Sequence, residues 1–176
     1  MGLLVEQNKV VILPPKNGTH TVNAVVAEMG LTHFCDGHIE GGRLRKMIAR
    51  SEYGAKPLEW GIHIRNPFDR FVSAVNYVFG YNDKTLGYAL EQVIDHPGRI
   101  YRNQLYWVED APANIRLFDS VPALLKWIGW ERRAPREGVG DYQWTAAEIK
   151  MHNKFEAAFA PFTVDYELRT RACTTN

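Results

Sequence analysis

A short apolar run, two prolines and a glycine loop dominate the first thirty residues. The run is KVVIL, residues 9–13, and its continuous β-branched side chains are typical of a parallel strand buried on both faces. Pro14 and Pro15 end this strand, because proline donates no hydrogen bond to a sheet. Apolar residues then recur with helical spacing at Val22, Val25, Val26 and Met29. Gly30 follows as a stop signal, so the order predicts a strand, a tight loop and a helix.

Strand and helix patterns alternate through the rest of the chain. Apolar runs of strand length lie at residues 31–34, 58–64 and 114–118. Helical periodicity or capping signals mark residues 41–54, 66–80, 85–96, 120–129 and 145–160, and Ser120 is the expected cap of the fourth of these helices. The alternation predicts one α/β domain over residues 1–176, with a mostly parallel sheet flanked by helices. The polar residues from about 169 onward are expected to form a frayed tail.

Composition and charge exclude several classes of protein. The formal net charge is only +1, so no nucleic-acid partner is expected, and any anion must be bound by locally placed charges. No apolar run reaches the length of a transmembrane helix, and no membrane partner is expected. The two cysteines, Cys35 and Cys173, are too few for a disulfide scaffold. These features predict a soluble, cytoplasmic protein.

The loop PPKNGTHT is a candidate anion site. Gly18 lets the backbone approach a ligand, and the helix that follows offers N–H groups and the positive end of its dipole. Lys16 adds a positive charge, and the hydroxyl groups of Thr19 and Thr21 are donors. The lysine precedes the glycine, unlike the GxxxxGKS or GxxxxGKT order of nucleoside triphosphatases. Taken alone, the segment fits an anion site and an ordinary Pro/Gly turn equally well.

A second candidate lies in the segment IRNPFDRFVSAVNY. Arg65 ends a predicted strand, and Asn66 and Pro67 are good residues for the cap and first position of a helix. Ser73 lies two turns into that helix, where side chains lean back toward the helix N-terminus. Arg65 and Ser73 could therefore hold one phosphate together. The alternative is a surface arginine beside a capped helix.

Together, PKNGTHT and RNPFDRFVSAVNY resemble the two nucleotide-binding motifs of sulfotransferases that use 3'-phosphoadenosine 5'-phosphosulfate (PAPS). In that family a PKxGTT loop holds the 5'-phosphosulfate and an RxPxxRxxSxxxY segment holds the 3'-phosphate. Weaker likeness continues in NIRLFDSVPALLKWIG and FTVDYEL. The resemblance implies a P-loop NTPase-like sulfotransferase fold. It also implies transfer of a sulfuryl group from PAPS to a hydroxyl or amine acceptor, leaving adenosine 3',5'-bisphosphate.

The resemblance assigns a role to each matched residue. Lys16 would neutralise charge on the leaving group, and Arg65 and Ser73 would hold the 3'-phosphate that distinguishes PAPS from ATP. The rest of the loop would cradle the 5'-phosphate through Asn17, Gly18, Thr19, His20 and Thr21. His20 departs from the family pattern because it stands where a second threonine is expected.

A base near the acceptor oxygen completes such a site, and a histidine that titrates near neutrality suits this role. His38 is the first candidate, because the glycines around it in GHIEGG indicate a loop at a site. His33 is the second, although its position in a predicted strand favours a packed core histidine. Glu40 is the reserve. The spacing of His33, Cys35 and His38 is irregular for zinc, and no metal is expected. His63, within the apolar segment GIHI, is expected to be a core residue.

Two other functions remain open. One is a nucleotide or small-molecule kinase with the same loop-and-sheet architecture, although the lysine lies on the wrong side of Gly18. The other is a non-catalytic module that binds the nucleotide but has lost transfer, which the replacement at His20 keeps open. For a sulfotransferase, the acceptor is expected to be a small molecule or a glycan. The choice between a monomer and a homo-oligomer stays open.

Overall fold

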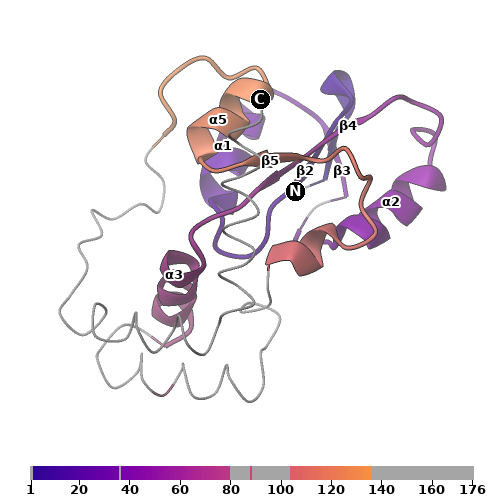
Figure 1. Cartoon of the computed structure of the whole chain (residues 1–176). Helices are drawn as coiled ribbons and strands as arrows, with labels where there is room; N and C mark the ends of the chain where they lie inside the picture. The colour runs from indigo at the N-terminus through magenta and orange to yellow at the C-terminus, as the bar shows by residue number, and fades with distance from the viewer. Residues whose placement is uncertain (1, 36, 80–87, 89–103, 136–176) are drawn as a thin grey trace. The chain divides into compact units, whose positions relative to one another are not determined.

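The computed structural model describes residues 2–35, 37–79, 88 and 104–135 (Figure 1). The chain divides into two compact units. The first unit comprises Met1–Ile64 and Gln104–Gly138, and the second comprises Arg65–Asn103 and Val139–Asn176. The first unit is thus made from two separate stretches of chain. That residues 1–176 form one domain stays a prediction.

A five-stranded sheet in the order β3-β1-β2-β4-β5 forms the centre of the first unit. Its strands are β1 (Leu3–Leu4), β2 (Lys9–Ile12), β3 (His33–Phe34), β4 (Glu59–His63) and β5 (Arg116–Phe118). Strands β2, β4 and β5 are parallel, whereas β1 is antiparallel to both β2 and β3. The sheet is therefore mixed, because β1 runs against the other four strands, which share one direction. A 3-10 turn, Val5–Gln7, and Asn8 with φ of 53° join β1 to β2, and so short a connection allows only antiparallel pairing.

Two apolar cores cover opposite faces of this sheet, so the predicted α/β class is confirmed. On one face, Val11 and Leu13 pack with α1 (Thr19–Glu28) and α5 (Val121–Trp127). On the other, Val10 and Ile12 pack with α2 (Gly41–Ala49) and the 3-10 helix η2 (Gln104–Val108). Successive residues of β2 thus point to opposite cores, as the continuous apolar run predicts.

Two of the expected helix caps are present. The Ser120 side chain accepts a hydrogen bond from the backbone N–H of Ala123 at 3.4 Å, at the start of α5. In the second unit, the Asn66 side chain accepts from the backbone N–H of Asp69 at 3.2 Å, at the start of α3 (Pro67–Phe79). Both helices therefore begin where the sequence predicts.

Several predictions concern residues outside the described part of the chain. These are the helices at 85–96 and 145–160, the FTVDYEL segment and the tail from about 169. Within the described residues, no helix combines the length and the apolar character needed to span a membrane.

Gly41 provides a test of packing between α2 and η2. A Cβ at this position would lie 2.9 Å from the Cβ of Ala111 and 3.0 Å from the carbonyl oxygen of Trp107. Glycine-to-alanine changes in helices ordinarily stabilise by roughly 0.5–1 kcal/mol. Here we expect Gly41→Ala to lower the free energy of unfolding by about 1–3 kcal/mol, because the two elements must separate.

Urea denaturation would measure this change, with Arg43→Ala as the control. Arg43 is exposed on the same helix, so its substitution should change stability by less than about 0.5 kcal/mol. A Gly41→Ala protein more stable than the parent would contradict the close packing.

Candidate functional site

The loop between β2 and α1 has an unusual backbone. Lys16 has a φ of 67° and Gly18 a φ of 78°, both in the left-handed region. That region costs a residue with a side chain about 1–2 kcal/mol, so the conformation of Lys16 is held by its surroundings. The backbone N–H of Asn17 donates to the carbonyl of Pro14 at 3.2 Å and closes a tight turn. The strand, tight loop and helix order predicted from the sequence is present.

Helix α1 starts directly from this loop. Gly18 occupies its N-cap position, and the first turn closes with a hydrogen bond from Val22 N–H to Gly18 O at 3.1 Å. Thr19 and His20 therefore lie in the turn whose amide groups precede the first helical bond. The Oγ1 atom of Thr19 is buried and makes no hydrogen bond within the part of the chain that the structure describes. His20 is exposed, whereas Thr21 is buried.

Asn17 fixes the loop through a buried hydrogen-bond network. Its side-chain Nδ2 donates to the carbonyl of His63 and to Oε1 of Gln104, both at 2.7 Å. The His63 ring nitrogen Nδ1 lies 2.9 Å from the carbonyl oxygen of Asn17 and donates to it. Asn17 is 0% exposed, Gln104 2% and His63 5%. The backbone N–H and C=O of Asn17 are thus both used within the protein, and its side chain anchors the loop to β4 and η2.

His63 combines two roles. Its burial in β4 was predicted from the apolar segment GIHI and is confirmed. Its hydrogen bonds to Asn17 were not predicted, because they join residues that are 46 positions apart in the sequence. The only available signal was that a buried polar side chain requires a partner.

Gly18 also contacts the start of α5. A Cβ at Gly18 would lie 2.6 Å from Cγ2 of Val121. Glycine is therefore required at this position for two reasons, the positive φ and the close approach of α5. Helix α5 consequently packs closely against the loop, with Val121 as the contact residue.

His38 is the best placed of the three candidate bases. Its Nδ1 lies 2.9 Å from the carbonyl oxygen of Leu13, the residue that opens the loop. Its ring meets the buried Trp107 ring edge-on, with centroids 6.3 Å apart. A carbonyl only accepts, so Nδ1 carries the proton, and in the neutral ring Nε2 carries the lone pair that can take a proton.

The other two candidates have different surroundings. His33 lies in the two-residue strand β3 but is exposed, so the expectation of a packed core histidine was wrong. A strand at the edge of a sheet leaves such a side chain in solvent. Glu40 is half-buried at the N-cap of α2 and makes no capping hydrogen bond with its side chain. Gly41 and Gly42 begin α2, as the predicted helix at residues 41–54 requires, so the loop expected around His38 ends before them.

Arg65 and Ser73 belong to the second unit, and both are half-buried. Burial lowers the pKa of the Arg65 guanidinium, and the carboxylate of Asp69 acts in the opposite direction. An arginine starts from a pKa so high that it remains charged at neutral pH. Ser73 lies within α3, as predicted. That Arg65 and Ser73 bind one 3'-phosphate stays a prediction from the sequence.

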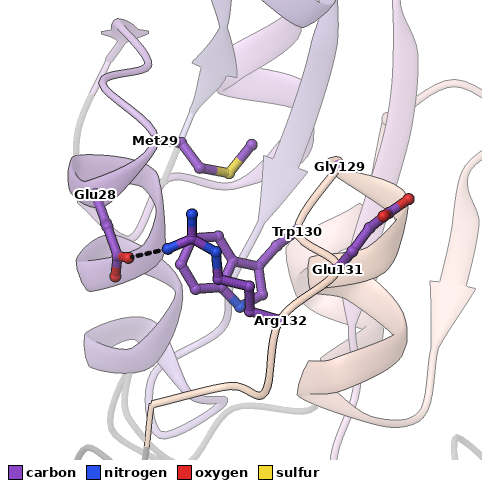
Figure 2. Close-up of a pocket in the computed structure, with 6 residues that line it drawn as sticks. All are labelled: Glu28, Met29, Gly129, Trp130, Glu131 and Arg132. Carbon is purple, nitrogen blue, oxygen red and sulfur yellow. Dashed lines mark hydrogen bonds and ion pairs between the residues drawn. The ribbon is translucent and has the colours of Figure 1, made fainter.

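A surface hollow lies at the C-terminal end of α1, away from the loop (Figure 2). Its lining includes Glu28, Met29, Trp130 and Arg132. The Arg132 guanidinium lies 5.3 Å from the centre of the Trp130 ring and 3.0 Å from the Glu28 carboxylate. The carbonyl end of a helix repels anions, and the Arg132 charge is already paired with Glu28. This hollow therefore does not suit a phosphate group.

Among the described residues, no three His, Cys, Asp or Glu side chains lie close enough to hold a metal ion together. Comparison of the chain with protein-family models, with curated proteins and with solved structures found no match. The two segments that resemble phosphate-binding motifs and the geometry of the loop are therefore the observations on which a function can be argued.

The conformation of Lys16 predicts a conflict between stability and binding. In Lys16→Ala the side chain still makes the positive φ unfavourable, whereas in Lys16→Gly the same φ has no steric cost. We expect the glycine variant to be more stable than the alanine variant by about 0.5–1 kcal/mol, as measured by urea denaturation. Neither variant should retain anion binding that depends on the lysine charge.

Equal stability of the two variants would show that the Lys16 backbone is not strained. Asn23→Ala and Asn23→Gly are a matched control pair, because Asn23 is exposed in the middle of α1. In that pair the alanine variant should be the more stable one, by about 1 kcal/mol.

Proposed function

We propose that the chain is a sulfotransferase that moves a sulfuryl group from PAPS to a hydroxyl or amine acceptor. The observation that carries this proposal is the loop after β2. Lys16 and Gly18 hold positive φ angles there, and α1 begins at the next residue. The positive charge of Lys16 and the N-terminus of α1 would suit the anionic phosphosulfate group. The resemblance of Arg65 and Ser73 to a 3'-phosphate motif selects PAPS among such donors.

The expected chemistry is a single in-line displacement at sulfur. The acceptor oxygen attacks, a new S–O bond forms, and the bond from sulfur to the bridging phosphate oxygen breaks. Lys16 and the α1 N-terminus would neutralise the charge that develops on this leaving oxygen. His38 would accept the acceptor's proton at Nε2, because its Nδ1 proton is already donated to Leu13. The products are the sulfated acceptor and adenosine 3',5'-bisphosphate.

A ligand-induced thermal shift tests the donor. Adenosine 3',5'-bisphosphate at about one hundred times its dissociation constant should stabilise the protein by about 2.7 kcal/mol. ATP with Mg²⁺ at the same concentration should stabilise it much less, because ATP has no 3'-phosphate. Greater stabilisation by ATP would favour the kinase alternative and overturn this proposal.

Substitution of Arg65 tests the recognition of the 3'-phosphate. We expect Arg65→Ala to remove most of the stabilisation by adenosine 3',5'-bisphosphate, whereas weaker stabilisation by adenosine 5'-monophosphate should stay unchanged. Arg116→Ala is a matched control, because Arg116 is an exposed residue of β5 outside the loop and α3. An equal loss for both nucleotides would assign Arg65 to a structural role.

The His38→Ala variant separates binding from transfer. It should still be stabilised by adenosine 3',5'-bisphosphate but should lose roughly 10²–10⁴ of its rate of sulfuryl transfer. The measurement is transfer of labelled sulfate from PAPS to a panel of alcohols, phenols and glycans. Retained turnover would move the role of base to His33 or Glu40. A parent protein that binds the nucleotide but sulfates nothing would support a non-catalytic module.

A further inference from the structure

We propose that Gln104 and His63 are positioning residues of the nucleotide loop, acting through Asn17 and not through the ligand. The inference rests on the proposed function, since it concerns the loop that would hold the phosphosulfate. Neither residue belongs to the motifs that the sequence brings out. Both instead contact Asn17, which lies between the two residues with positive φ, Lys16 and Gly18.

The hydrogen bonds of Asn17 leave the loop little freedom. A side-chain amide nitrogen carries two protons, and Asn17 gives one to each of its two acceptors. The His63 ring bonds back to the Asn17 carbonyl, so His63 contacts this residue through both its main chain and its side chain. Three hydrogen bonds from two distant elements therefore determine the position of one loop residue.

Gln104 is the acceptor that a substitution can remove with least change to the backbone. The His63 carbonyl belongs to the main chain, whereas Oε1 of Gln104 belongs to a side chain. Without this acceptor, one N–H of Asn17 would be buried without a partner. We expect the loop to relax from the positive φ of Lys16, because one of the three hydrogen bonds that fix the neighbouring Asn17 is then lost. A loop that must be ordered again on binding lowers affinity.

Calorimetric titration with adenosine 3',5'-bisphosphate at 25 °C tests the proposal on folded protein. Gln104→Met keeps the length of the side chain but removes the oxygen acceptor, and we expect its dissociation constant to rise about tenfold. Gln104→Glu keeps an acceptor oxygen and should bind more tightly than Gln104→Met, although its buried carboxylate repels the anionic nucleotide. Rescue by this conservative variant is not expected if Gln104 only fills space.

Glu109→Gln serves as the control, because Glu109 is exposed just after η2 and its side chain takes no part in the network. Its dissociation constant should be unchanged. Gln104→Asn keeps the amide but withdraws it by one methylene, and it provides the same test if the methionine variant does not fold.

Unchanged affinity in folded Gln104→Met or Gln104→Asn protein would overturn the positioning role while leaving the proposed function intact. Failure of the parent protein to bind adenosine 3',5'-bisphosphate would instead overturn the proposed function, and the positioning role with it. Equal weakening in Gln104→Met and Gln104→Glu would show a packing role and would also overturn the proposal.

Discussion

The reciprocal hydrogen bonding between Asn17 and His63 is the constraint on which the candidate site depends. It joins the loop after β2 to the end of β4, so that two neighbouring parallel strands share one set of buried polar contacts. Such contacts have only a modest net effect on stability while they are satisfied, but they are costly to break. The loop is therefore held in one conformation, because breaking these hydrogen bonds would leave buried polar groups without partners.

That conformation is not one that Lys16 would adopt by itself. The buried network fixes the neighbouring Asn17, and Val121 packs closely against Gly18, so two sets of contacts restrain the loop around Lys16. Strain of this kind is often found where a backbone must present its N–H groups to a ligand. The loop thus carries backbone strain at Lys16, and its geometry is already arranged before any ligand binds.

Local signals in the sequence predicted the β2–loop–α1 unit, the Ser120 and Asn66 caps and the burial of His63. They failed where the outcome depends on residues far apart in the chain. The bond from Asn17 to Gln104 spans 87 positions, and no periodicity encodes it. Strand β1 has two residues, too few for an alternating pattern, and it alone makes the sheet mixed. Gly41 and Gly42 fitted both a helix and a loop in the sequence, because their close packing against residues 107–111 cannot be read from composition.

Because the first unit is made from two stretches of chain, the segment between them can change in length during evolution. The chain leaves this unit after Ile64 and returns at Gln104, and Asn17 bonds to the residues at both crossings, His63 and Gln104. The ends of the intervening segment are thus already tied together. The entropy of closing a segment grows only slowly with its length, by about 0.6 kcal/mol for each doubling. Insertions and deletions between the crossings should therefore disturb the loop little, and relatives could differ widely in the size of this segment.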